Sequence, residues 1–150
     1  MIRRLPLALA VLALAGLAGS CRRAEAPLAL NQKGPEPRRI AMGQLVRLED
    51  YLVPGKTTIF DFYSDFCPPC RAIKPLVEKL HESRYDVAVV EVDVNRAGVT
   101  GVIDWQSPVV AEFHLESIPH FKVFDPTGQL IADGDPAFQL VEQWIQAASF

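Results

Sequence analysis

The sequence of 150 residues contains few of the side chains that bind metals or nucleic acid. It has only three cysteines and three histidines, with no second cysteine pair. A structural zinc site needs four such ligands, so this composition does not favour one. Acidic residues outnumber basic ones by 18 to 15, which gives a formal net charge of −3. Nucleic-acid-binding domains normally carry a basic face, and this balance gives no support to one.

The apolar run from Leu5 to Ala18 is too short to cross a membrane comfortably, because it has about 14 residues and a spanning helix needs about 20. Arg3 and Arg4 precede the run, and small residues at positions 18–20 follow it. A basic start, a short apolar stretch and a small-residue cleavage site together indicate a secretory signal peptide over residues 1–20. Its removal changes the formal net charge to about −5.

Cys21 directly follows the small residues, and this position accounts for the odd number of cysteines. Residues 17–21, Leu-Ala-Gly-Ser-Cys, resemble the lipobox of bacterial lipoproteins, in which the signal is cut before a lipidated cysteine. The resemblance implies an anchor at Cys21 on the periplasmic side of a bacterial membrane; the alternative is a plain secretory signal with a leftover thiol. Residues 22–39 are charged and lack apolar periodicity, so lipidated cysteine and flexible linker together are expected to cover 21–39.

Residues 40–150 alternate between strand-like and helix-like patterns and are expected to form one domain. Thr57–Tyr63 is rich in β-branched and aromatic side chains, which is typical of a buried strand. Apolar residues at positions 73, 76, 77 and 80 fall on one face of a helix predicted from about Pro68 to Ser83. Val87–Val92 is a second apolar run, short enough for a central strand.

The C-terminal third predicts a hairpin and a final helix. Phe121–Phe124 and Leu130–Ala132 flank the sequence Asp-Pro-Thr-Gly, which favours a turn. Apolar residues at 138, 141, 144 and 145 return to helical spacing, and Ser107-Pro108 is a candidate start for a short helix. This order of elements predicts an α/β fold, with a central mixed sheet flanked by helices.

The sequence Cys67-Pro68-Pro69-Cys70 stands where the predicted strand ends and the predicted helix begins. A thiol at a helix N-terminus meets unpaired N–H groups and the positive end of the helix dipole, which favour the reactive thiolate. Cys70 lies about one helical turn further on and can reach back to resolve a mixed disulfide. The pattern therefore favours a redox-active pair.

Other interpretations of the two cysteines remain open. A structural disulfide across one helical turn would close a very small loop and stabilise little. A copper site using both thiols has no Met or His beside the motif. A hypothesis from another functional class is a non-catalytic copper or protein chaperone that retains the two cysteines. The redox hypothesis requires no metal and no cofactor beyond the disulfide itself.

Residues 60–75, which contain this motif, resemble the active-site region of the thioredoxin superfamily. Ser117-Ile118-Pro119, followed by a strand, is similar to the cis-proline loop of that superfamily, so the likeness extends over residues 55–148. It implies a thioredoxin-like domain over residues 40–150, with Cys67 as the nucleophile and Cys70 as the resolving thiol.

The resemblance also assigns roles around the dithiol. Asp61 matches a buried acid that assists proton transfer at the second cysteine; the alternative is an aspartate that faces solvent at a strand edge. Pro119 matches the cis-proline, and Ile118 would offer backbone pairing to a substrate chain. The other residues expected to contact substrate are Phe66, Pro68 and Pro69.

Three features depart from the pattern of the superfamily. Phe66 replaces the usual Trp, which keeps the apolar surface but removes an indole donor. Glu91 stands where thioredoxins carry a Lys, and an anion there would raise the pKa of Asp61 where the two side chains approach. Residues 96–106 resemble an insertion, in which Trp105 is either a partner surface or a cap on the core.

The Pro-Pro dipeptide and the Ile118–Pro119 pair resemble extracytoplasmic thioredoxin-like reductases more than dedicated disulfide oxidases. The resemblance implies a membrane-tethered thiol–disulfide oxidoreductase that exchanges electrons with protein thiols and disulfides, as a reductase. A membrane-bound electron donor would then recycle the pair. The alternative with the same residues is a weak oxidase or isomerase.

Overall fold

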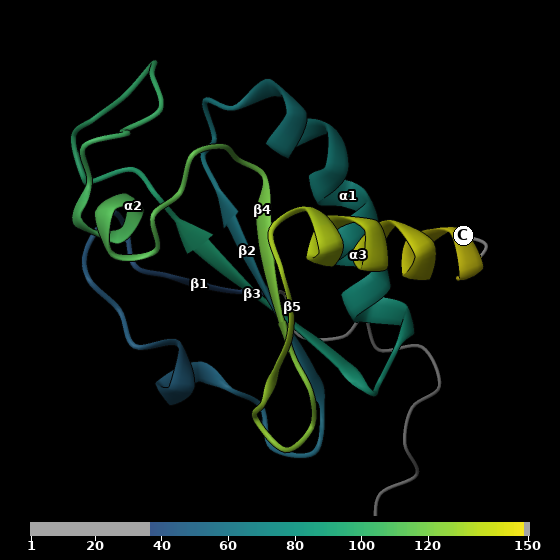
Figure 1. The fold of residues 1–150 in the computed structure, drawn as a ribbon. Coiled ribbons are helices and arrows are strands. Elements are labelled where there is room, and N and C mark those ends of the chain that lie inside the picture. Colours follow the sequence, from purple (N-terminus) through teal and green to yellow (C-terminus); the bar gives the residue numbers. More distant parts are fainter. Residues whose placement is uncertain (1–36, 149–150) are drawn as a thin grey trace, which may run out of the picture. The chain divides into compact units, whose positions relative to one another are not determined.

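The computed structural model describes residues 37–148 (Figure 1). The predicted signal peptide, the predicted lipidation at Cys21 and the linker up to residue 36 lie outside the described residues. Within residues 37–148, no helix is both long and apolar enough to cross a membrane.

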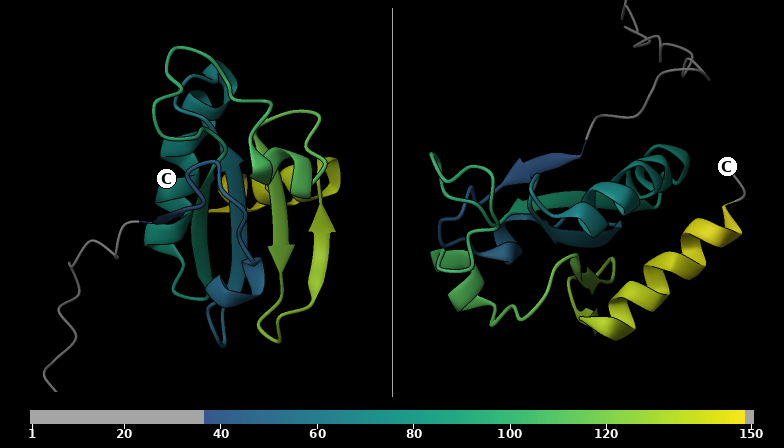
Figure 2. Two further views of the ribbon diagram at one scale, coloured as in Figure 1. Left: turned by 90° about the vertical axis from the view of Figure 1, so that its left-hand side faces the viewer. Right: turned by 90° about the horizontal axis from the view of Figure 1, so that it is seen from above.

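A five-stranded mixed sheet with helices on both faces forms the described part of the chain (Figures 1 and 2). The elements are β1 (Arg38–Ile40), the 3-10 helix η1 (Leu48–Tyr51), β2 (Thr57–Tyr63), α1 (Pro68–Ser83), β3 (Val87–Asp93), α2 (Pro108–Glu112), β4 (His120–Phe124), β5 (Leu130–Asp133) and α3 (Asp135–Ala147). The strand order is β1-β3-β2-β4-β5. The predicted α/β fold with a mixed sheet is therefore confirmed.

The central strand β2 pairs in parallel with β3 and antiparallel with β4. On the outside, β1 pairs in parallel with β3, and β5 pairs antiparallel with β4. Helices α1 and α3 lie over one face of the sheet, and η1 and α2 lie over the other (Figure 1). Because β2 is central and both its faces are covered, the residues that follow it are held on a rigid base.

Two clusters of apolar side chains fill the space on either side of the sheet. The cluster under α1 and α3 contains Ile59, Val77, Leu80, Val87, Val89, Phe121, Val123, Ala137 and Val141. The cluster on the other side includes Phe60, Phe62, Val90, Val92, Val109 and Val110, and it extends to Cys67 and Cys70. Alternate residues of β2 thus point to opposite faces, as the strand period requires.

The bounds of β2 and α1 match the prediction. The helix begins at Pro68 because prolines at its first two positions lack N–H groups that would otherwise be unpaired there. The first strand differs from the prediction, because the sequence pattern predicts a linker that includes Arg38 and Arg39. Both arginines pair with β3. Only Ile40 of this three-residue strand is buried, so the sequence shows no apolar pattern there.

Candidate active site

The two cysteines of the Cys-Pro-Pro-Cys motif lie where β2 ends and α1 begins. Cys67 and Cys70 form a disulfide, with their Cα atoms 5.3 Å apart. Cys67 is the N-cap residue of α1, and its Sγ accepts a hydrogen bond of 3.2 Å from the backbone N–H of Cys70. Such a donor stabilises negative charge on the sulfur once the disulfide is reduced. The cysteines are 1% and 3% exposed, so a partner has to come very close to reach them.

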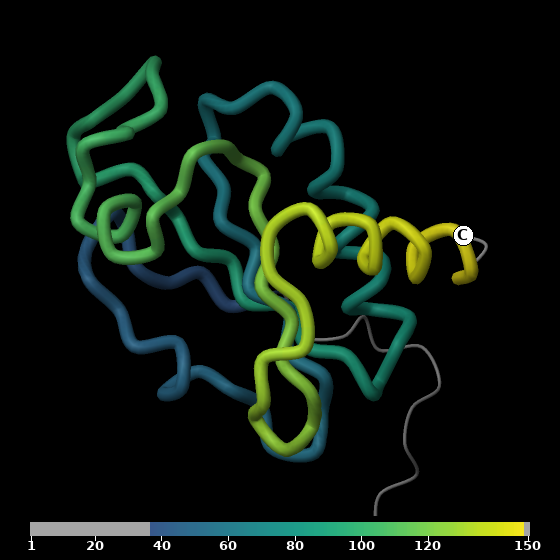
Figure 3. Tube along the Cα trace, in the orientation of Figure 1, coloured from purple at the N-terminus to yellow at the C-terminus, as the bar shows by residue number. Residues whose placement is uncertain are grey.

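The loop before β4 runs beside the start of α1 (Figure 3), and its Ile118 contacts the disulfide. The Ile118–Pro119 peptide bond is cis, as expected, and the carbonyl oxygen of Ile118 lies 3.6 Å from Sγ of Cys67. In the disulfide the sulfur carries no proton, so this is a contact only. In the dithiol, the Cys67 thiol is placed to donate to that oxygen. Two motifs far apart in the sequence therefore meet at one sulfur atom.

Apolar side chains are exposed beside the buried disulfide. Phe66 is 37% exposed, and Pro68 and Pro69 are exposed at the start of α1. The Phe66 backbone N–H donates to Oγ of Ser64, which is fully buried. This hydrogen bond holds the turn that carries Phe66. These residues lie where the sequence predicted substrate contacts, and that role stays a prediction.

Asp61 is buried in the central strand, so the alternative of a solvent-facing aspartate is wrong. Its side chain is 4% exposed, and its Oδ1 has no hydrogen-bond partner among the described residues. Burial and the neighbouring Glu91 carboxylate raise the pKa of Asp61 to about 7, while Lys74 opposes this rise. A carboxyl group with this pKa exchanges its proton near neutral pH, as an acid–base group needs to.

Lys74 of α1 forms an ion pair with Glu91 of β3. The same ammonium lies 3.6 Å from the carboxylate of Glu78 and 4.8 Å from the ring centroid of Tyr63. The sequence singled out Glu91 but not Lys74, because the pairing depends on how α1 is rotated over the sheet. The signal that could have found it is the position of Lys74 on α1, four residues after Cys70.

Arg39 connects β1 with the turn that precedes the cysteines. Its Nη2 lies 2.6 Å from Oδ2 of Asp65 and 3.2 Å from Oδ2 of Asp93, and its guanidinium lies 5.2 Å from the Tyr63 ring centroid. Asp65 stands two residues before Cys67. The sequence gives no sign of this contact, because its pattern predicts a linker up to residue 39.

The Asn95 side chain and an ion pair between Arg96 and Asp104 join the two ends of the loop at residues 96–106. Nδ2 of Asn95 donates to the carbonyl groups of Val99 and Val102, at 3.1 and 2.8 Å, and its Oδ1 accepts from the N–H of Asp104 at 3.2 Å. Trp105 is 44% exposed and belongs to neither core cluster, so it does not cap the core. The loop lies at the same end of the sheet as the N-terminus of α1 (Figures 1 and 2).

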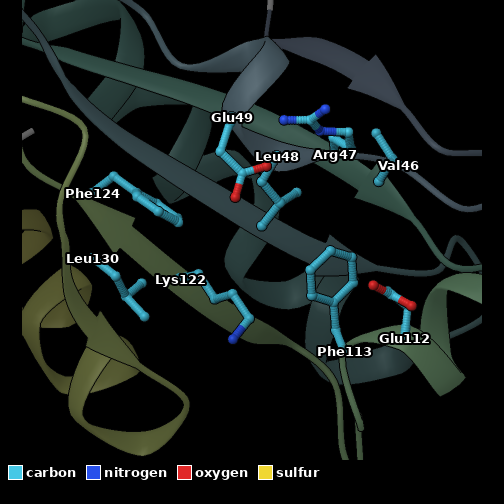
Figure 4. Close-up of a pocket in the computed structure, with 9 residues that line it drawn as sticks. All are labelled: Val46, Arg47, Leu48, Glu49, Glu112, Phe113, Lys122, Phe124 and Leu130. Atoms are coloured by element: carbon cyan, nitrogen blue, oxygen red, sulfur yellow. The ribbon is translucent and has the colours of Figure 1, made fainter.

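A separate groove of about 210 Å³ lies on the η1 and α2 side of the sheet (Figure 4). It is lined by Val46, Arg47, Leu48, Glu49, Glu112, Phe113, Lys122, Phe124 and Leu130. Neither cysteine borders it, and its Lys122 is paired with Asp133 at 2.5 Å. The groove is therefore separate from the disulfide. Within residues 37–148, no group of three or more His, Cys, Asp or Glu side chains could hold a metal ion.

The mixed sheet, the disulfide at the start of α1 and the cis-proline loop beside it define a thioredoxin-fold protein with a CxxC centre. The family model for Thioredoxin matches residues 48–145, which is more than half of the chain. The chain belongs to the thioredoxin family.

Two curated relatives share this region. The chain is 32% identical over 98 residues to the thiol:disulfide interchange protein TxlA homolog of Synechocystis sp., covering 62% of this chain and 49% of the relative. It is also 32% identical over 98 residues to the chloroplastic thioredoxin-like protein HCF164 of Arabidopsis thaliana, covering 65% of this chain and 34% of the relative. The chain thus spans about half the length of the first relative and about a third of the second.

Solved structures support the fold. Thioredoxin f from spinach chloroplast, in its short form, aligns with a TM-score of 0.52 at 20% identity, covering 81% of this chain and 100% of that chain. Mitochondrial thioredoxin 3 of Saccharomyces cerevisiae, in its oxidised form, aligns with a TM-score of 0.51 at 23% identity, covering 74% of this chain and 94% of that chain.

Proposed function

We propose that this protein is a thiol–disulfide oxidoreductase that reduces disulfides in other proteins through Cys67 and Cys70. The observation that carries the proposal is the disulfide at the N-terminus of α1, with Sγ of Cys67 held between the Cys70 N–H and the Ile118 carbonyl. Membership of the thioredoxin family and the likeness to a thiol:disulfide interchange protein support the same reaction class.

The reaction would proceed in two exchanges. The Cys67 thiolate attacks one sulfur of a substrate disulfide, which forms a mixed disulfide and releases the other substrate sulfur as a thiolate. The Cys70 thiolate then attacks Sγ of Cys67 and releases the second substrate sulfur. The substrate gains two electrons and two protons, and the enzyme is left with the Cys67–Cys70 disulfide. Asp61 would accept the proton of Cys70 before the second attack.

The rim of the disulfide suits an extended protein chain as substrate. Phe66, Pro68 and Pro69 would supply apolar contacts, and the backbone of Ile118 beside Pro119 would pair with the substrate backbone. The deep burial of both sulfurs supports a selective partner, because only a chain that fits this rim brings its own sulfur within reach.

The proposed setting is the periplasmic side of a bacterial membrane, with the domain tethered by a lipid on Cys21. What supports it is the basic and apolar N-terminal pattern followed by small residues and Cys21. A membrane-bound electron donor would return Cys67 and Cys70 to the dithiol form. Metabolic labelling with a radioactive fatty acid tests the anchor: the full chain should be labelled, and Cys21→Ser should lose both the label and the association with membranes.

The first test of the function is the reduction potential of the Cys67–Cys70 pair in the full chain, measured by equilibration with glutathione and dithiothreitol buffers. For this two-electron couple about 30 mV corresponds to about 1.4 kcal/mol, so modest differences are measurable. A strongly reducing potential, with turnover of a disulfide-bonded protein substrate that is lost in Cys67→Ser, supports the reductase. A strongly oxidising potential would instead identify a disulfide donor. Copper retention without any turnover would identify a metal chaperone.

A further inference from the structure

We propose that Lys74 and Glu91 are positioning residues that set when Asp61 takes and gives up its proton during the reaction at Cys70. The inference rests on the proposed function, because it concerns the proton step of the same dithiol. It is carried by three placements: the strand register that brings two carboxylates together, the helix position of the lysine, and the ion pair that joins the lysine to one of the carboxylates.

The strand register places the two carboxylates side by side. Asp61 and Glu91 are partners in the parallel pairing of β2 with β3. Ile59 and Val89, two residues earlier on each strand, belong to the core cluster under α1 and α3. Because strand side chains alternate between faces, Asp61 and Glu91 point to that same face. Both are buried, at a point where two negative charges repel each other strongly.

The helix places a cation over this pair. Lys74 follows Cys70 by four residues on α1, so the two side chains lie on the same face of the helix, one turn apart. Its ammonium reaches Glu91 across the gap between helix and sheet. Lys74 is therefore linked both to the carboxylate beside Asp61 and, through one turn of α1, to the thiol that Asp61 would deprotonate.

The charged groups that face Asp61 come from two elements only among the described residues. Burial is the largest influence on the pKa of Asp61 and raises it; Glu91 of β3 raises it further, whereas Lys74 of α1 lowers it. On the other side, β4 places the apolar Phe121 opposite Asp61, and α3 contributes only apolar side chains such as Val141 to this core. Asp61 thus responds to a balance between one anion and one cation that neutralise each other.

The chemical consequence is a controlled proton step. With Glu91 alone beside it, Asp61 would hold its proton too firmly to accept one from Cys70. With Lys74 alone, Asp61 would ionise early and would bind a proton too weakly to take it from a thiol. The pair keeps the Asp61 carboxyl between these limits, and the partly exposed Lys74 gives the site contact with solvent.

Charge-removing variants test this arrangement in the full chain. The variants are Glu91→Gln, Lys74→Met and their combination, with Lys79→Met as the control, since it removes an exposed cation from the same helix. Two readouts are compared: the ¹³C titration of the Asp61 carboxyl, and the pH profile of disulfide reduction under single turnover.

The proposal expects opposite shifts. Glu91→Gln should lower the Asp61 midpoint by about one pH unit, and Lys74→Met should raise it by a similar amount. The double variant should fall between them, Lys79→Met should match the wild type, and the pH profile should follow the carboxyl. Shifts in the same direction, or unchanged midpoints with a lower melting temperature, would show a purely structural pair and overturn the proposal. Opposite carboxyl shifts with a pH profile that stays fixed would overturn it as well. An absence of turnover in the wild type would instead reject the proposed function, while the carboxyl titration would still report on the charge balance.

Discussion

Gly43 lies so close to Arg96 that a Cβ atom at Gly43 would be 2.5 Å from the backbone nitrogen of Arg96. Its N–H donates to the carbonyl of Asp93 at 2.8 Å, and its own carbonyl accepts from the N–H of Val109 at 3.3 Å. The segment after β1 therefore joins the end of β3 to the start of α2. This junction supports the loop at the active-site end of the sheet, and only a glycine fits it.

The first prediction follows from this junction. Gly43→Ala should lower the free energy of unfolding by about 2 kcal/mol or more, because it combines a positive φ of 74° with a backbone clash. Gly55→Ala is the matched control, because Gly55 has nearly the same φ, 75°, but nothing within 4 Å of the added Cβ. That control should lose only about 1 kcal/mol. Urea unfolding measures both, and equal losses would contradict the close approach.

Asp61 provides a prediction about stability and pH. Burial, together with Glu91, raises its pKa from 3.8 to about 7 in the folded protein. The native state therefore binds this proton more tightly than the unfolded chain, so the contribution of Asp61 to stability is present below pH 4 and is lost as the pH rises towards 7.

Asp61→Asn removes that loss. The variant should unfold with a free energy higher than that of the wild type by on the order of 2–4 kcal/mol at pH 8, and by little at pH 4. Denaturant unfolding of the oxidised protein at the two pH values checks this difference. A gain of the same size at both would mean that ionisation of Asp61 is not its source.

The side chain of Asn95 organises the loop at residues 96–106. Asn95→Ala should lower the free energy of unfolding by about 1–3 kcal/mol, because two part-buried carbonyl groups and the buried N–H of Asp104 lose their hydrogen bonds. Amide exchange between residues 96 and 104 should accelerate while the exchange of β2 stays slow. Gln106→Ala, an exposed change in the same loop, serves as the control. If both variants behave alike, Asn95 does not close the loop.

Single cysteine variants separate the two thiols. In Cys70→Ser the mixed disulfide at Cys67 cannot be resolved, so it should accumulate with a disulfide-bonded substrate. In Cys67→Ser no such adduct should form, because Cys70 lies within the first turn of α1, whereas Cys67 stands at the N-cap beside the Ile118–Pro119 loop. Non-reducing mass spectrometry detects the adduct. Equal trapping by both variants would contradict the assignment of Cys67 as the nucleophile.

The centre of the fold was predictable from the sequence, whereas its edges were not. β2 and α1 carry strong apolar patterns, and the prolines at positions 68 and 69 mark the start of the helix. The strand β1 carries two arginines and one buried isoleucine, so no periodicity indicated it. The helix α2 begins after Ser107 as predicted, but the serine side chain makes no capping hydrogen bond.

In the candidate site, the residues of local motifs were predictable from the sequence and the long-range polar contacts were not. Cys67, Cys70 and the Ile118–Pro119 loop were predictable because each belongs to a local motif, and their mutual contact followed from the resemblance. The contacts of Lys74 with Glu91 and of Arg39 with Asp65 were not, because each joins two elements whose relative rotation no local pattern specifies. Long-range polar contacts of this kind depend on packing, which a single sequence does not display.

The short strand β1 also determines how firmly Arg39 is held beside the site. So short an edge strand is held by few backbone hydrogen bonds, and it should open far more often than β2. Each opening carries Arg39 away from Asp65, two residues before Cys67, and leaves the turn at the disulfide without its guanidinium. An opening of this outer strand would therefore change the charge close to Cys67 for as long as the strand stays open.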